Sequence, residues 1–113
     1  MKDARTNALL DTLMKCIAAC ETCADRCLQE ENINMLAACI RKDRDCADAC
    51  SMAARFVARG SDQTSRILQL CVVTCSACEE ECGKHEHGHC RTCAAVCQEC
   101  RTACEEYMSV TVQ

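Results

Sequence analysis

The sequence of 113 residues has no proline and no tryptophan, and only three glycines, one tyrosine and one phenylalanine. Proline and glycine are the residues that most often interrupt helices, so their scarcity favours an all-helical chain with short connections. A chain of this length supports a single core in one small domain. Because aromatic side chains, the usual bulky fillers of such a core, are almost missing, another type of side chain must occupy the interior.

The sequence also lacks a long apolar run at its start and a basic patch. Without such a run we expect neither a signal peptide nor a transmembrane span, and we expect a cytoplasmic location. The net charge of −4 is modest, and stretches such as 41–45 alternate in sign as solvated helix surfaces do. We therefore expect neither nucleic acid nor a membrane as a partner.

What the sequence does contain is sixteen cysteines, which are arranged in four ladders. Within the ladders the spacing is three or four residues, apart from the seven between Cys39 and Cys46, and this is the spacing by which a bundle helix places its core side chains. Cysteine thus stands where leucine is usual, which predicts a core lined with thiols. The ladders are Cys16, Cys20, Cys23 and Cys27; Cys39, Cys46 and Cys50; Cys71, Cys75, Cys78 and Cys82; and Cys90, Cys93, Cys97, Cys100 and Cys104.

The pattern predicts four helices over about residues 4–30, 33–59, 62–82 and 89–108. Asp3 or Thr6 is suited to cap the first helix, and Gly60 can take the positive φ that ends the second. The β-branched residues in 110–112 should fray. Short connections make consecutive helices antiparallel neighbours, so we expect residues 1–113 to form one up-down-up-down four-helix bundle, an all-α fold.

The two halves of the chain repeat one another, since Cys16 matches Cys71 and Cys39 matches Cys93. The exception is Asp43, which stands where the repeat has Cys97. This aspartate is either a hard, poorly matched metal ligand or a structural residue that reaches water or an arginine. The poor match between carboxylates and soft metals favours the structural interpretation.

Antiparallel packing would give the bundle two different ends. One end gathers the apolar residues Leu9, Leu13, Ala53, Val57, Leu68 and Tyr107 and should be closed. The other end gathers the turn between the first and second helices and the glycine-flanked loop before the fourth helix. This end should be accessible to solvent. There, His85, His87, His89 and Met35 are candidate ligands where metal would enter. The alternatives are a plain polar loop for the histidines and a packing role beside Leu36 for the methionine.

Thiols in such numbers suggest either a disulfide-stapled secreted domain or a metal site. Cysteines three or four apart on a helix tilt in the same direction, which suits a shared metal better than a disulfide. Soft thiolates select Cu(I), zinc or iron–sulfur clusters. Four zinc tetrathiolates would leave about −2 at each site without a compensating cation, whereas about one Cu(I) per thiolate leaves the interior neutral. We therefore expect many Cu(I) ions, on the order of one per cysteine.

Storage of these ions is the favoured function, and an iron–sulfur or thiol redox protein is the alternative. Four C-x-x-C units, including that of Cys20 and Cys23, fit a cluster protein, but they are embedded in longer ladders and the ferredoxin run with its closing proline is missing. An enzyme is not expected, because no histidine and no pair of acidic residues lies on the ladders.

The repeated C-x-x-x-C units resemble those of the four-helix-bundle copper storage proteins, specifically their cytosolic branch. The resemblance covers roughly residues 9–108. It implies inward cysteines that bind many Cu(I) ions, usually in a homotetramer, with histidine or methionine at the mouth. A copper chaperone is a candidate partner for exchange of the ions. Beside the ladders, Ile17, Ile40, Val72 and Val73 are candidates for the subunit contact. The units are Cys16/Cys20, Cys23/Cys27, Cys46/Cys50, Cys71/Cys75, Cys78/Cys82, Cys93/Cys97 and Cys100/Cys104.

Overall fold

The computed structural model describes residues 3–111, and these form four α-helices and one short 3-10 helix joined by turns. The elements are α1 (Ala4–Leu28), η1 (Ile33–Leu36), α2 (Ala37–Ala58), α3 (Thr64–Cys82) and α4 (Gly88–Thr111). Along the part of the chain that the structure describes, no helix is both long and apolar enough to cross a membrane.

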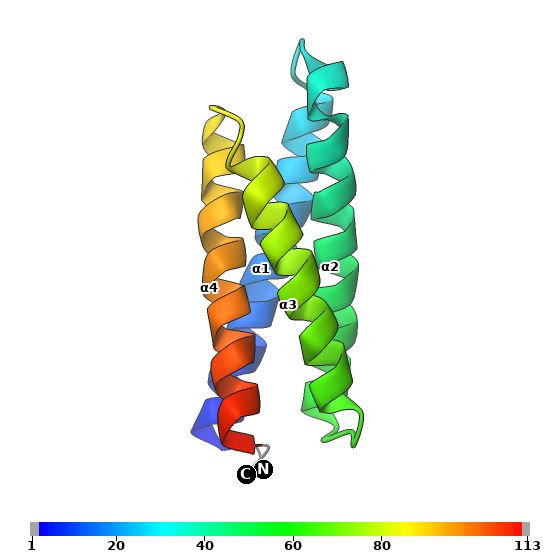
Figure 1. Cartoon of the computed structure of the whole chain (residues 1–113). Helices are drawn as coiled ribbons and strands as arrows, with labels where there is room; N and C mark the ends of the chain where they lie inside the picture. The colour runs from blue at the N-terminus through cyan, green and yellow to red at the C-terminus, as the bar shows by residue number, and fades with distance from the viewer. Residues whose placement is uncertain (1–2, 112–113) are drawn as a thin grey trace.

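The helices form an elongated antiparallel bundle of 47 × 21 × 19 Å (Figure 1). Each helix packs against the helix that follows it, and α4 closes the bundle against α1. In Figure 1, α3 crosses the front of the bundle and α1 lies behind it. The predicted all-α, up-down-up-down architecture is confirmed, and every helix therefore turns one face toward a common axis.

Local signals in the sequence account for two of the helix ends. The Asp3 carboxylate accepts a hydrogen bond of 2.8 Å from the backbone N–H of Thr6, which caps α1 as predicted. Gly60 has a φ of 63° after the end of α2. Its N–H donates to the carbonyl of Val57, and the N–H of Ser61 donates to the carbonyl of Phe56, which is the hydrogen-bond pattern of a Schellman motif.

Other boundaries differ from the prediction by a few residues. The helix expected from residue 33 begins as η1 and becomes α-helical at Ala37, because Leu36, which is fully buried, has a backbone conformation outside the helical region. The expected fraying at 110–112 is wrong for Val110 and Thr111, which are helical; Val112 lies outside the described residues. Near this end of α4 the Tyr107 hydroxyl lies 3.0 Å from the Thr6 hydroxyl of α1, which ties α4 to its neighbour.

The axis of the bundle is filled by the cysteines and, toward the ends, by aliphatic side chains. All sixteen cysteines have 0% of their surface exposed, and all are free thiols. Leu13 and Leu68 are also fully buried, at the end opposite to the α3–α4 connection. The ladders therefore face inward as predicted, and the apolar closed end is present.

Candidate metal centre

The cysteine sulfurs form a column along the axis because each helix contributes one ladder at the same radius. Neighbouring sulfurs of different helices lie 3.2–4.0 Å apart, from Cys39 and Cys82 at the short limit to Cys39 and Cys90 at the long limit. Within a helix, sulfurs four residues apart lie at similar distances, for example 4.0 Å between Cys16 and Cys20. Sulfurs this close can share a metal ion of low coordination number.

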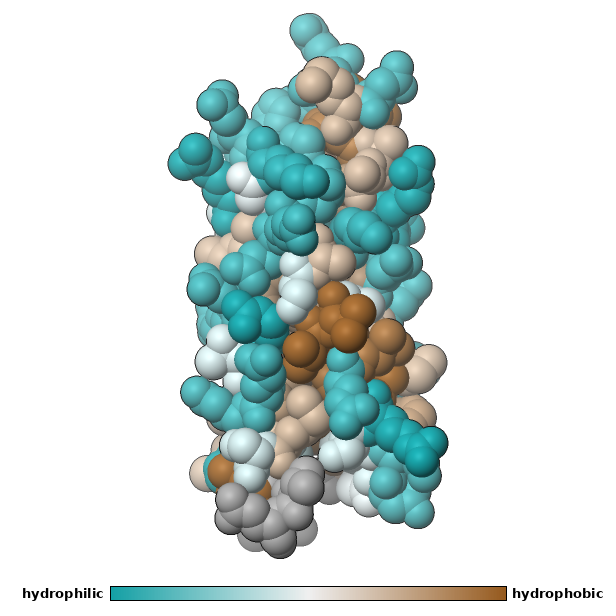
Figure 2. Space-filling model, in the orientation of Figure 1, coloured by the Kyte–Doolittle hydropathy of each residue, from teal (hydrophilic) through white to brown (hydrophobic). Residues whose placement is uncertain are grey.

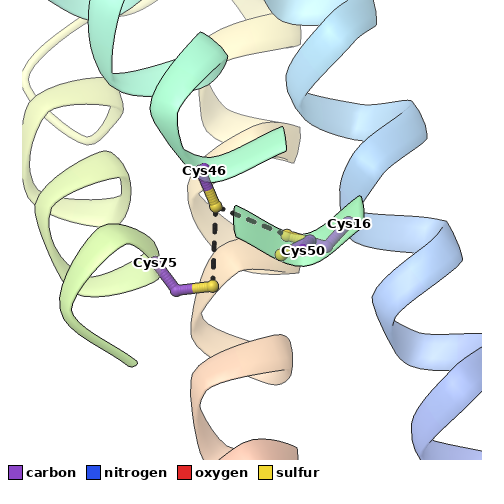
Figure 3. Close-up of side chains that lie close together, drawn as sticks. All are labelled: Cys16, Cys46, Cys50 and Cys75. Atoms are coloured by element: carbon purple, nitrogen blue, oxygen red, sulfur yellow. Dashed lines mark hydrogen bonds between the residues drawn. The ribbon is translucent and has the colours of Figure 1, made fainter. Parts of the chain in front are cut away.

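Figure 3 shows one part of this column, where α1, α2 and α3 meet. The Cys46 sulfur lies 3.5 Å from that of Cys75 and 3.8 Å from that of Cys16. Together with Cys50, these sulfurs lie within 4.8 Å of one another, and all four residues are buried. The group has the size and the ligand chemistry of a soft-metal site.

Several such groups overlap along the axis. Cys16 and Cys46 recur in a second group with Cys20 and Cys97, and Cys20 and Cys97 recur in a third. Because each of these four sulfurs belongs to two groups, each of the four thiolates could bridge metal ions in neighbouring groups. Separate tetrahedral zinc sites would need ligands of their own, so the overlap favours a chain of bridged ions.

Asp43 interrupts the column of sulfurs with a carboxylate. It is fully buried, and its Oδ1 accepts hydrogen bonds from the thiols of Cys78 (3.2 Å), Cys93 (3.2 Å) and Cys82 (3.3 Å). The expectation that this side chain reaches water or an arginine is wrong. α2 directs position 43 to the axis as it does the neighbouring cysteines, so the hydrogen-bond donors to the carboxylate among residues 3–111 are thiols.

Burial raises the pKa of Asp43 to about 8, and the nearby Cys93 acts in the same direction when it is ionised. Asp43 belongs to a possible ligand group with Cys23, Cys39 and Cys82. A carboxylate in that position has the same charge as the thiolate that the repeat predicts. It can therefore balance one monovalent cation even where it is a poor ligand.

The mouth of the column lies at the α3–α4 connection. Here Cys23, Cys27, Cys39 and Cys90 form a buried group of four sulfurs. The Nδ1 atom of His89 lies 3.6 Å from the sulfurs of Cys23 and Cys90 and 4.0 Å from that of Cys27. One imidazole nitrogen therefore faces three thiols at the last layer of the column.

The other candidates at this end have different surroundings. The Nε2 atom of His85, in the α3–α4 connection, lies 2.9 Å from Glu81 in the last turn of α3, and Nδ1 of His87 lies 3.3 Å from Glu30. Met35 is 72% exposed, so a packing role beside Leu36 is wrong. Among the contacts of residues 3–111, His89 is the histidine whose ring nitrogen approaches the thiols.

Glu30 was missed by the reasoning from sequence. Its Oε2 lies 2.8 Å from Nε2 of His89, and this hydrogen bond lowers the pKa of the carboxyl group. A single glutamate in a polar turn gives no signal of such a contact, because its partner lies 59 residues away in the chain.

Two of the thiols at the mouth, Cys27 and Cys90, are poor acids. Burial raises the pKa of Cys90 to about 11, and it also raises that of Cys27. A metal ion that binds here must therefore displace protons from neutral thiols. The fold and the site together define a class of protein, a four-helix bundle whose interior is a multinuclear thiolate site.

Comparisons with known proteins agree with this class. The sequence profile of the family described as "Copper storage protein" matches residues 2–109. The chain belongs to the copper storage protein family. Membership confirms the resemblance that the repeated C-x-x-x-C units indicated.

Three relatives place the chain within this family. A Bacillus subtilis protein described as the uncharacterized cysteine-rich protein YhjQ is 39% identical over 99 residues, which are 88% of this chain and 92% of that protein. The copper storage protein Ccsp from Streptomyces lividans, solved with 10 copper equivalents, is 38% identical with a TM-score of 0.90, over 93% of this chain and 84% of that one. The Cu(I)-bound copper storage protein BsCsp3 is 38% identical with a TM-score of 0.87, over 90% of this chain and 96% of that one.

Proposed function

We propose that this chain stores Cu(I), with its sixteen cysteines as the ligands and about one ion bound per cysteine. The observation that carries the proposal is the set of sixteen fully buried thiols, most of which have another sulfur within 4.0 Å. Of the solved relatives described above, Ccsp is loaded with 10 copper equivalents and BsCsp3 is Cu(I)-bound. Ions in a closed core are kept away from solvent, which is what a store requires.

Charge balance explains how the core can hold so many ions. Each Cu(I) displaces one thiol proton, so that a filled column carries about one positive charge per thiolate and remains close to neutral. A divalent metal at the same occupancy would leave a large uncompensated positive charge in a low-dielectric interior. The arrangement thus favours monovalent copper over zinc.

Copper should enter and leave at the mouth. His89 is the first candidate ligand there, while His85, His87 and Met35 lie farther from the thiols or in contact with other groups. The opposite end is closed by fully buried aliphatic side chains. We propose that a copper chaperone or another thiol ligand exchanges ions at the mouth.

We further propose that residues 1–113 act as one non-catalytic Cu(I)-binding domain in the cytoplasm. Free buried thiols are typical of a reducing compartment, and a solved Streptomyces lividans relative is described as a cytosolic copper storage protein. The ladders contain no pairing of a nucleophile with a base, which catalysis would need. Among residues 3–111 the one buried carboxylate, that of Asp43, is surrounded by thiols.

A homotetramer is our proposal for the assembly. Val73 is 64% exposed and Leu70 is 47% exposed on α3, which faces the viewer in Figure 1. Figure 2 shows an apolar patch in the middle of the same face of the molecule, surrounded by polar side chains. Such a patch suits a subunit contact. Light scattering should show a tetramer that Val73→Asp dissociates, while the exposed control Val110→Asp should not.

The function is tested by an anaerobic titration of reduced protein with Cu(I) in competition with a chromogenic chelator. We expect uptake of about one copper per cysteine, with helical circular dichroism unchanged throughout, because packing of the buried side chains of all four helices holds the bundle together. Saturation after a few ions, or visible iron in protein purified without added metal, would support the iron–sulfur or thiol redox alternative.

A further inference from the structure

A short polar chain connects the mouth of the column to the end of α1. Glu30 lies in the turn after α1, and His89 lies in the first turn of α4. Oε2 of Glu30 lies 2.8 Å from Nε2 of His89, on the side of the ring away from the thiols. Nδ1 of the same ring lies 3.6 Å from the sulfurs of Cys23 and Cys90.

The position of one proton follows from this geometry. An ionised carboxylate only accepts hydrogen bonds, so the short contact requires that Nε2 of His89 carries a hydrogen and donates it to Glu30. In the neutral ring Nδ1 then has a free lone pair. That lone pair points to the mouth thiols, where a soft ion would bind or a thiol proton would be released.

We propose that Glu30 is a positioning residue, which holds His89 with its Nδ1 lone pair directed at the mouth thiols and thereby speeds the capture of Cu(I). The inference deepens the proposed function and rests on it. The chemistry is that of a carboxylate that orients a metal-binding imidazole through the ring's other nitrogen. Without it, the His89 ring could turn over and present a carbon atom or an N–H group to the thiols.

His87 supports the same arrangement from the solvent side. Its ring stacks on that of His89 with 5.3 Å between the ring centroids and 5° between the planes. Its Nδ1 lies 3.3 Å from the same Oε2 atom of Glu30. Glu30 therefore contacts both rings. Its loss would remove the hydrogen bond to His89 and also the contact to His87, whose ring stacks on that of His89.

The first test needs no copper. In reduced, metal-free protein, long-range ¹H–¹⁵N correlations and NOEs of the His89 ring should show one state with the hydrogen on Nε2. Glu30→Ala should give a second ring orientation or averaged signals, and Glu30→Gln should keep the single state because its amide oxygen still accepts the hydrogen bond. An unchanged ring state in Glu30→Ala would overturn the proposal.

The second test measures uptake of Cu(I) from a chelator complex by stopped flow. Glu30→Ala should slow the first phase about tenfold, which is the lower limit for loss of such a partner, and leave the final capacity unchanged. The exposed neighbour Glu31 provides the matched control, since Glu31→Ala removes the same charge and should load normally. Slowing by Glu30→Gln equal to that by Glu30→Ala would overturn positioning in favour of simple charge attraction.

A double-mutant cycle completes the argument. In a His89→Ala background, Glu30→Ala should cause no further slowing, because the residue through which Glu30 acts is gone. A further tenfold slowing there would overturn the proposal. Failure of the proposed function is distinguishable, since wild-type protein would then take up little copper, whereas failure of this inference leaves wild-type loading intact.

Discussion

The two ends of the bundle close the same column of thiols with opposite chemistry. At one end Leu13 and Leu68 are fully buried, and the Tyr107 hydroxyl lies 3.0 Å from that of Thr6. At the other end the last layer of thiols is covered by His89, whose side chain is only 13% exposed and is held by Glu30. One cover excludes water, whereas the other can bind a cation or exchange a proton.

The two ends of the column therefore differ in chemistry, although the ladders that form the column look alike in sequence. Aliphatic side chains offer neither a ligand nor a route for protons, so the apolar end contributes stability. The histidine end is the one that we propose for exchange of ions with solvent and with partners. Variants at the two ends should therefore affect different measurements, folding in one case and loading in the other.

The largest effect should come from the apolar end. Leu13→Ala removes a fully buried side chain and leaves a cavity, so the free energy of unfolding of the metal-free protein should fall by about 3 kcal/mol. Chemical denaturation checks this value. Protein that folds should still load the same number of copper ions. A loss of loading without a loss of stability would contradict the division between the two ends.

A pH-dependent effect is expected from the half of the column near the mouth. The pKa of Asp43 is raised from 3.8 to about 8, so the folded chain keeps a proton that the unfolded chain releases at pH 5–7.5. The free energy of unfolding of the metal-free protein should therefore fall as the pH rises, by up to about 1.4 kcal/mol per pH unit.

Denaturation curves at several pH values test this slope, and Asp43→Asn is the control. The asparagine cannot ionise, so its slope in the same window should be smaller than that of the wild type. Equal slopes in both proteins would show that Asp43 does not hold the proton.

At the mouth itself, His89→Ala should slow the first phase of Cu(I) uptake about tenfold, equivalent to about 1.4 kcal/mol, and change the free energy of unfolding by less than about 0.5 kcal/mol. The physical reason is the loss of the imidazole nitrogen that faces Cys23 and Cys90. Stopped-flow uptake and denaturation are the two measurements. A large loss of stability would mean that this end also serves mainly to hold the fold.

The smallest effect should come from the other side chains near the mouth. His85 contacts Glu81 of α3, and Met35 is 72% exposed. Separate changes of each to alanine should therefore alter the uptake rate by less than about twofold. Slowing as strong as that of His89→Ala would place a further ligand where copper enters.

Most of the fold could be predicted because the local sequence signals, namely helical spacing, caps and turns, rarely conflict with one another. The alternation of three and four residues sets the inward face of each helix, and all sixteen predicted cysteines are indeed buried. The cap at Asp3 and the turn at Gly60 follow from local chemistry alone. Boundaries such as the start of α2 at Ala37 depend on how Leu36 packs in the folded bundle, so the local pattern left them uncertain by a few residues.

The site was predicted less completely because its decisive contacts join residues far apart in the chain. Sequence placed His85, His87 and His89 in one loop but could not rank them, since which ring turns inward depends on the packing of α1 and α4. The burial of Asp43 among thiols and the contact between Glu30 and His89 have the same origin.

By itself, the sequence determined that the helices would bury a continuous set of soft ligands, because helical periodicity turns spacing along the chain into a face. Tertiary structure alone decided which sulfurs share a site, which carboxylate enters the column and which histidine covers it. Those choices depend on the relative height and rotation of the four helices, which side chains from all of them set together.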